Sequence, residues 1–270
     1  GYPLGMSLPD VAAHYTQGNL LDRIFDALRA VGKDPDHLSV QDLTPVDHFH
    51  TLGPIATTGL ADATGFEGGE EVLDVGSGLG GPARTLAESY GCRVTGIDLT
   101  PEYCRAAEEL NARVGLQDRI VIQEANALAL PFADRTFDVV WTMHVMMNIE
   151  DKESLYAQLA RVLKPGGKLS FFDLIAGRGD PYFPVPWADE PSISHLVDED
   201  QLRLQLGAAG FHIKIWQELT REGAAFFGNL VPSPLGPHLL IRDMPGKMAN
   251  LRRNLEEGRV RAIRSVCTVD

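Results

Sequence analysis

The chain has 270 residues, of which 44% are hydrophobic and 23% charged, and its formal net charge is −13. A chain of this length and composition can bury a large core, so we expect one large α/β domain with insertions, or a domain with a cap. The excess of carboxylates argues against a nucleic-acid partner, which would require a basic face. No apolar run approaches the roughly 20 residues needed to cross a bilayer, so we expect no membrane span.

Three cysteines, Cys92, Cys104 and Cys267, lack the spacing of a metal or redox site. An odd number of unpaired cysteines fits a reducing compartment. We therefore expect a cytoplasmic protein whose thiols are buried and unreactive.

Residues 6–65 are predicted to form an N-terminal helical cap. Apolar side chains recur at helical spacing over Asn19–Val31, which predicts an amphipathic helix. Pro45 is expected to end whatever structure Val40–Leu43 forms. A second helix-like run covers Ile55–Ala63.

Residues 66–270 are predicted to form a second unit. From Glu71 onward, short apolar runs alternate with helical patterns, which indicates a mostly parallel sheet covered on both faces. The predicted strands are Val72–Val75, Arg93–Ile97, Ile120–Gln123, Asp138–Met143 and Lys168–Leu174. The predicted helices are Pro82–Tyr90, Pro101–Val114 and Lys152–Val162.

Two insertions are predicted in this unit, at about residues 176–197 and 219–257. Gly177–Pro191 is rich in proline and too long for a simple connector, so we interpret it as a lid. A predicted helix, Asp198–Ala209, and a predicted strand, His212–Trp216, separate the two insertions.

A glycine-rich turn joins the first predicted strand to the helix after it. Because glycine has no Cβ, a ligand can lie against the bare backbone of such a turn. Gly76, Gly78 and Gly81 have the spacing of the dinucleotide fingerprint, and Asp98 lies where a ribose-binding acid is expected. Nicotinamide cofactors and S-adenosylmethionine (SAM) both fit this pattern, because both contain an adenosine ribose.

Asp74 favours SAM. It lies two residues before the first glycine of the turn, at the mouth of the strand. Its carboxylate would repel a pyrophosphate, whereas SAM carries an ammonium and a sulfonium and no phosphate. The alternative is a structural role, in which Asp74 caps the turn or the following helix.

Further short segments follow the turn in a recognisable order: Val72–Gly81, Val94–Asp98, Leu130–Asp138 and Leu163–Gly167. Together they resemble the core of the class I SAM-dependent methyltransferases. Gly80–Arg84 and Pro184–Trp187 are similar to the small-molecule branch, which includes sterol and tocopherol C-methyltransferases and sarcosine/dimethylglycine N-methyltransferases.

The resemblance implies an α/β fold with a doubly wound, seven-stranded, mostly parallel Rossmann-like sheet. The N-terminal helical cap and the lid insertions would cover the carboxyl ends of the strands. Val260–Val269, which is rich in β-branched residues, would be the antiparallel strand typical of the family.

The resemblance also implies a set of cofactor contacts. The residues that would hold the amino-acid end of SAM are Asp74, Gly76, Ser77, Gly78 and Gly80. Asp98 would accept hydrogen bonds from the ribose hydroxyls, and Leu99 would pack on the adenine. Asn126 and Ala127 would meet the adenine edge. Asn126 stands where the family usually has Asp, but its amide oxygen can still accept from the adenine amino group.

Methyl transfer from a sulfonium is an in-line displacement, so the protein must hold the nucleophile about 3–3.5 Å from the methyl carbon and exclude water. No metal is required, and a general base helps when the nucleophile is a hydroxyl or a protonated amine. We predict His144 and His50 as catalytic residues. His144 follows a strand whose carboxyl end faces the ligand crevice, so it is also expected beside the cofactor. The alternative for His144 is simple contact without proton transfer, and the alternative for His50 is an ordinary surface or packed histidine.

Five residues are predicted to line the substrate pocket: His48, His50, Met147, Tyr182 and Trp187. Aromatic faces attract alkylated ammonium groups, and methionine gives a pocket an adaptable lining. Packing of the lid or the core is the alternative interpretation.

The sequence therefore predicts a SAM-dependent methyltransferase that acts on a small molecule and forms S-adenosylhomocysteine (SAH). The acceptor, whether an N, O or C nucleophile, and the oligomeric state are left open. The alternatives are a nicotinamide-dependent oxidoreductase, which would share the glycine pattern, and a non-catalytic SAM-binding domain.

Overall fold

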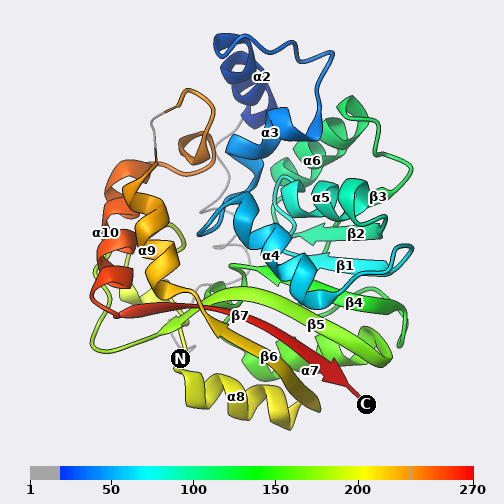
Figure 1. Ribbon diagram of the computed structural model, residues 1–270, viewed down its shortest axis with the longest axis vertical. Coiled ribbons are helices and arrows are strands. Elements are labelled where there is room, and N and C mark those ends of the chain that lie inside the picture. The colour runs from blue at the N-terminus through cyan, green and yellow to red at the C-terminus, as the bar shows by residue number, and fades with distance from the viewer. Residues whose placement is uncertain (1–18, 231–232) are drawn as a thin grey trace, which may run out of the picture.

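The computed structural model describes residues 19–230 and 233–270, which form one seven-stranded sheet in the order β3-β2-β1-β4-β5-β7-β6 (Figure 1). The strands are β1 (Glu71–Val75), β2 (Arg93–Asp98), β3 (Ile120–Glu124), β4 (Phe137–Met143), β5 (Leu163–Ala176), β6 (Phe211–Glu218) and β7 (Val260–Val269). The first five strands pair in parallel, and β7 runs antiparallel between β5 and β6. The predicted fold class and the antiparallel final strand are confirmed.

The strand order reverses beside β1. This strand pairs with β2 on one side, where Val75 is opposite Ile97, and with β4 on the other, where Val75 is opposite Thr142. In open α/β sheets, a ligand crevice forms at such a point, outside the carboxyl ends of the strands. The topology therefore places the glycine turn after β1 at the expected binding position.

Helices cover both faces of the sheet because successive strand residues point to opposite sides. On one face, α4 (Pro54–Thr64), α5 (Gly81–Ser89) and α6 (Pro101–Arg113) pack against a core that contains Val72 and Trp141 (Figure 1). On the other face, α7 (Lys152–Val162) and α8 (Glu199–Ala208) pack against the neighbouring residues Leu73 and Val140. Among the described residues, no helix is both long enough and apolar enough to cross a membrane.

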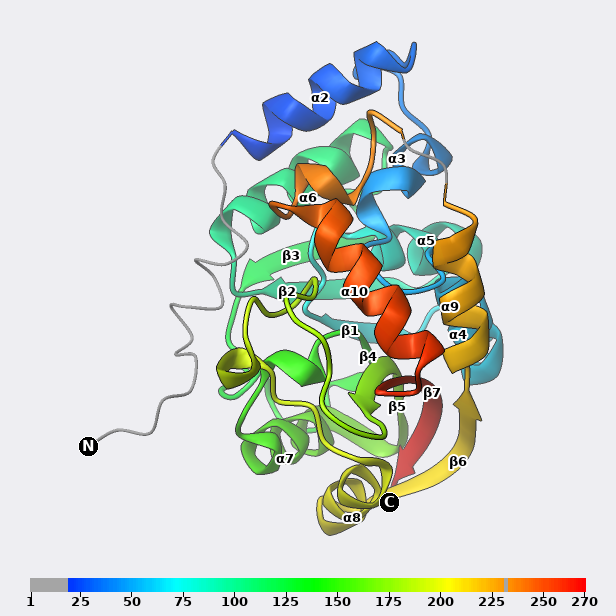
Figure 2. The ribbon, with the colours of Figure 1, turned by 90° about the vertical axis from the view of Figure 1, so that its left-hand side faces the viewer.

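A cap of four helices lies around the carboxyl ends of the strands, with α10 crossing in front of them (Figure 2). Its members are α2 (Leu20–Ala30), α3 (Val40–Asp47), α9 (Thr220–Gly228) and α10 (Met244–Glu256). A third apolar cluster joins α2 and α3 to α6 and to the short η3 turn (Pro237–Leu239). The cap is thus built from both ends of the chain. The division into domains at residue 65 stays a prediction, and α4, which lies before it, packs on β5 and β7.

The predicted loop between β5 and α8 packs against α10. Asn254 exchanges hydrogen bonds with the backbone of Tyr182, and Asn250 donates to the carbonyl of Pro184 at 2.9 Å. Lys247 forms an ion pair of 2.7 Å with Asp189. These contacts join the two predicted insertions into one wall.

One prediction about the cap is wrong. Pro45 does not end the preceding structure, because α3 continues through it to Asp47. The side chains of Ser39 and Asp42 form a capping box that fixes the start of this helix. Pro45 has no N–H to donate to the carbonyl of Gln41. Both residues lie on the exposed side of α3, where water can hydrogen-bond to that carbonyl instead.

The packing of α3 on α5 can be tested at Gly81. A Cβ added there would lie 2.7 Å from the carbonyl carbon of Asp47, with the backbone of α3 in the way. We expect Gly81→Ala to lower the free energy of unfolding by about 1–3 kcal/mol in urea denaturation, because overpacking forces the backbone to shift.

Gly207→Ala is the matched control. Gly207 lies inside α8, and its added Cβ would meet nothing within 4 Å. We expect this variant to be more stable by about 0.5–1 kcal/mol, because alanine loses less chain entropy on folding. A Gly81→Ala protein as stable as the control would show that α3 is not seated on α5.

Candidate functional site

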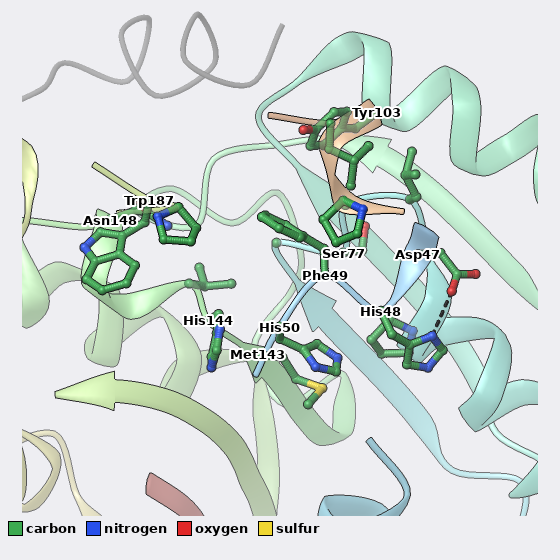
Figure 3. A pocket seen from close by; sticks show the side chains of 18 of the residues that line it. Asp47, His48, Phe49, His50, Ser77, Tyr103, Met143, His144, Asn148 and Trp187 are labelled. Atoms are coloured by element: carbon green, nitrogen blue, oxygen red, sulfur yellow. Dashed lines mark hydrogen bonds and ion pairs between the residues drawn. The ribbon is translucent and has the colours of Figure 1, made fainter. Parts of the chain in front are cut away.

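A cavity of about 880 Å³ opens at the carboxyl ends of β1, β2 and β4, beneath the cap. This size suits small-molecule binding. Its walls come from the glycine turn, the segment after α3, the lid loop and the helices α9 and α10. Figure 3 shows that side chains from the cap and from the end of β4 point into the same space.

The glycine turn is fixed by the end of β2. The backbone N–H groups of Gly76 and Ser77 both donate to the carbonyl of Ile97, at 2.8 and 2.9 Å. The N–H of Gly78 donates to Asp98 Oδ2 at 3.0 Å. Gly76 and Gly78 have φ values of 71° and 54°, a left-handed conformation that glycine adopts without strain. This geometry brings Asp74, Ser77 and Asp98 to one side of the cavity.

Several acceptors at this end are buried without a partner. Neither Asp74 Oδ2 nor Ser77 Oγ has a hydrogen-bond partner among the described residues. Burial, together with the charge of Asp98, raises the pKa of Asp74 to about 7. Burial also raises the pKa of Asp98. A site with unpaired acceptors and two carboxyls fits a ligand that supplies donors and positive charge, as the ammonium and ribose hydroxyls of SAM would.

The predicted adenine contacts lie next along the cavity wall. Leu99, Asn126 and Ala127 all line it. Asn126 Oδ1 accepts a hydrogen bond of 2.8 Å from the N–H of Leu128, which holds the loop after β3 in a tight turn. One lone pair of this oxygen remains for the predicted bond from the adenine amino group.

Gly80 is placed differently from the expectation. Gly80 is not among the residues that line the cavity. It is the N-cap of α5, with a φ of 81°. Its contribution to the site is therefore the change of direction from the turn into α5. A direct contact with the cofactor is not supported.

Three histidine rings, those of His48, His50 and His144, stand in a row along the cavity (Figure 3). The ring centroids of His48 and His50 are 5.7 Å apart, and those of His50 and His144 are 6.0 Å apart. The His144 ring stacks on Phe172 at 5.1 Å, and the backbone of His144 is left-handed, with a φ of 53°. The structure therefore brings together both predicted catalytic histidines, from segments far apart in sequence.

Burial keeps two of these rings uncharged at neutral pH. It lowers the pKa of His144 to about 3, and His144 Nε2 has no hydrogen-bond partner among the described residues. Burial, and then the neighbouring His48 and His144, lower the pKa of His50 well below its usual value. His50 Nε2 lies 3.2 Å from the hydroxyl of Thr57, whereas its buried Nδ1 has no such partner within the described chain.

His48 belongs to a buried network that the sequence did not reveal. Its Nδ1 lies 2.7 Å from Asp47 Oδ1, and its Nε2 lies 3.3 Å from the Thr85 hydroxyl. The other oxygen of Asp47 accepts from Arg84 at 2.8 Å, and Arg84 also donates to Asn111. Although burial opposes its ionisation, the pKa of Asp47 is lowered by the bond from His48 and the charge of Arg84. With both ring nitrogens engaged, His48 anchors the cap to α5.

The remaining predicted pocket residues separate into two groups. Met147 and Trp187 line the cavity, and the indole N–H of Trp187 donates to Ser194 at 2.9 Å. Tyr182 does not line the cavity. The guanidinium groups of Arg253 and Arg259 lie 3.8 and 4.3 Å from its ring centroid, on the outer side of the lid. The expectation that Tyr182 belongs to the substrate pocket is corrected accordingly.

Sequence reasoning missed the apolar wall that the cap contributes. The missed lining residues include Phe49, Phe226, Phe227, Met244, Met248 and Leu251. Phe226 and Phe227 fall in the second predicted insertion, at about residues 219–257, and lie in the last turn of α9.

Comparison with known proteins agrees with this geometry. A family model described as "Methyltransferase domain" matches residues 73–171. A methyltransferase, GfsG, from Streptomyces halstedii is 33% identical over 159 residues, which are 58% of this chain and 57% of that protein. The glycine/sarcosine/dimethylglycine N-methyltransferase from Actinopolyspora halophila is 31% identical over 180 residues, 67% of this chain and 30% of that protein. The chain thus spans less than two thirds of the length of either relative.

Solved structures share the whole fold. The geranyl diphosphate C-methyltransferase of Streptomyces coelicolor A3(2), crystallised with Mg²⁺, geranyl diphosphate and SAH, has a TM-score of 0.74 at 16% identity, covering 100% of this chain and 99% of that chain. The [4+2]-cyclase SpnF has a TM-score of 0.69 at 21% identity, covering 100% and 98%. The chain therefore has the α/β fold of these solved structures. Residues 73–171 thus match a methyltransferase domain, and both relatives named above are methyltransferases.

Asp74→Asn tests the electrostatics of the cofactor end. The unfolded-state carboxyl ionises near its ordinary pKa of 3.8, whereas the folded one keeps its proton up to about pH 7. The buried carboxyl therefore lowers the stability of the ligand-free protein progressively as the pH rises between those values. We expect Asp74→Asn to melt several degrees higher than the wild type at pH 8, with the difference shrinking at pH 5.

The same substitution should weaken SAH binding at least tenfold by calorimetry, because the amide offers a neutral acceptor in place of a charged one. A variant that binds SAH as tightly as the wild type would contradict the assignment of Asp74 to the amino-acid end. A melting difference independent of pH would contradict the raised pKa.

Proposed function

We propose that this chain transfers a methyl group from SAM to a small-molecule acceptor and releases SAH. The observation that carries the proposal is the set of unpaired acceptors at the glycine turn, Asp74 Oδ2 and Ser77 Oγ, beside the carboxyl of Asp98. A cation with hydrogen-bond donors satisfies all three, and a pyrophosphate would be repelled by both carboxyls.

We assign the cofactor contacts within this proposal as follows. Asp74, Ser77 and the backbone of Gly76 and Gly78 hold the amino-acid end. Asp98 accepts from the ribose hydroxyls, using lone pairs left after its bonds from Gly78 and Thr100. The cavity-lining residues Leu99, Asn126 and Ala127 surround the adenine.

The bound cofactor supplies an electrophilic methyl group on a positively charged sulfur. The protein then has to align an acceptor with the C–S bond and exclude water. His144 and Met143 line the cavity at the end of β4, between the cofactor end and the cap. We therefore place the acceptor on that side, with the apolar cap excluding water from it.

His50 is the better candidate for a general base. The hydroxyl of Thr57 donates to the sulfur of Met143 at 3.6 Å, so it accepts from His50 Nε2–H. This arrangement leaves the lone pair on Nδ1, which is buried without a partner among the described residues. When the acceptor is a hydroxyl, its proton passes to Nδ1 as the new O–C bond forms and the C–S bond breaks. His144 then serves as an uncharged wall of the site.

The cellular setting of this reaction is part of the proposal. A reducing cytoplasm is supported by three cysteines that are all free thiols and buried. The absence of a nucleic-acid partner is supported by the net charge of −13.

Calorimetry with SAH and NADH tests the cofactor. We expect SAH to bind with a dissociation constant in the micromolar range and NADH to show no heat at the same concentrations, because the carboxyls of Asp74 and Asp98 repel its pyrophosphate. Binding of NADH without SAH would contradict the proposal. Turnover of radiolabelled SAM with a panel of alcohols, phenols and amines would then separate an enzyme from a binding domain.

His50→Ala tests the general base once an acceptor is found in that panel. We expect kcat to fall by about 10²–10⁴, with the SAH dissociation constant changed less than threefold. Since the pKa of His50 is already low, the wild-type rate should stay flat from pH 6.5 to 8. His212→Ala is the matched control, because His212 lies on the exposed surface of β6. A fully active His50→Ala protein would rule out this role.

A further inference from the structure

Much of the cavity wall outside the glycine turn is apolar. This part includes Phe49 after α3, Trp187 of the lid, Phe226 of α9, and Met248 and Leu251 of α10. These side chains come from both insertions and from the segment before the sheet. Together they form what we term the acceptor end.

No lysine or arginine lines the cavity within the part of the chain that the structure describes. Residues 1–18 and 231–232 contain neither lysine nor arginine in their sequence. Three of the cations near lining residues in sequence are paired: Arg84 with Asp47 at 2.8 Å, Lys247 with Asp189 at 2.7 Å, and Arg252 with Glu256 at 2.7 Å. A fourth, Arg242, is exposed and does not line the cavity. Lys152 donates to three backbone carbonyls.

Of the histidines that line the cavity, His144 and His50 supply no positive charge, and His238 is exposed to solvent. Burial lowers the pKa of His144 to about 3 and the pKa of His50 well below its usual value, so both are uncharged at neutral pH. Nor do the described residues contain a group of three or more His, Cys, Asp or Glu side chains arranged to hold a metal ion. An anionic group would therefore find no cationic side chain in the described lining of this end.

The carboxylates of the lining do not make this end a cation site. Asp74 and Asp98 lie at the cofactor end, and Asp47 is neutralised by Arg84. Glu150 and Asp151 are exposed at the rim. The interior of the acceptor end is therefore uncharged, and burying an unpaired charge of either sign in it would be costly.

We infer that the acceptor is an uncharged, predominantly apolar molecule, and that phosphorylated or carboxylated acceptors are excluded. This inference rests on the proposed function, because it concerns the second ligand of the same cavity. It distinguishes the chain from the fold neighbour crystallised with geranyl diphosphate, whose ligand carries a diphosphate. The site thus selects its acceptor through the free-energy cost of removing a charged group from water, rather than through ion pairing.

Three ligands that share the same eight-carbon chain and differ in the charge of their head group test this inference: 1-octanol, octyl phosphate and octylamine. Each would displace the neutral fluorescent probe N-phenyl-1-naphthylamine from SAH-saturated protein at pH 8. We expect 1-octanol to bind at least tenfold tighter than octyl phosphate and than protonated octylamine. Equal or tighter binding of either charged ligand overturns the inference.

Two lysine variants locate the effect. Met248→Lys places an ammonium in the acceptor end. We expect it to raise the affinity for octyl phosphate at least tenfold relative to the affinity for 1-octanol. Leu204→Lys, at a leucine on α8 that is 74% exposed, should leave all three affinities unchanged. An unchanged preference in a folded Met248→Lys protein also overturns the inference. SAH calorimetry on the same samples separates this outcome from a failure of the proposed function, which would show as loss of SAH binding.

Discussion

The placement of Asp74 in the fold is the constraint on which the rest of the site depends. Its carboxyl is buried at the end of β1, near a second carboxyl, with no cation among the described residues to offset it. Such an arrangement is unfavourable in the empty protein and favourable once a cation enters. The N–H groups of Gly76, Ser77 and Gly78 donate to Ile97 and Asp98, and Asp74 Oδ2 has no hydrogen-bond partner among the described residues. Under the proposed function, the turn selects the charge of its ligand as well as admitting it.

A second buried carboxylate, Asp47, attaches the cap to the sheet domain, and unlike Asp74 it is fully paired. Asp47 at the end of α3 is satisfied by both His48 and Arg84, and Arg84 lies in the first turn of α5, directly after the glycine turn. A fully paired buried ion pair holds elements together, whereas an unpaired carboxyl binds a ligand. The same short segment of chain therefore connects the cofactor end to the histidine row, and the position of His50 depends on it.

Much of the fold follows from the sequence, because the strands are apolar runs bounded by glycine and proline. Lys152–Val162 and Val260–Val269 have the predicted bounds. The cofactor end also follows, since it is built from contiguous residues of a recognisable turn. The pairing of Asp47 with Arg84 could not be predicted, because it joins side chains 37 positions apart that meet only through packing of α3 on α5. Tyr182 was misplaced for a related reason: an aromatic residue in an insertion can face either side, and two arginines hold this one outward.

A fold shared with both methyltransferases and a cyclase does not decide the chemistry, so the assignment has to come from how charge is distributed in the cavity. The cofactor end is acidic and the acceptor end uncharged, and the two meet at His144, a ring that burial keeps neutral. A charged histidine there would repel a sulfonium. A neutral one adds no positive charge beside the sulfonium of the proposed cofactor, and it does not stabilise that charge either. Methyl transfer removes it, and a low-polarity surrounding favours a transition state in which charge is being lost.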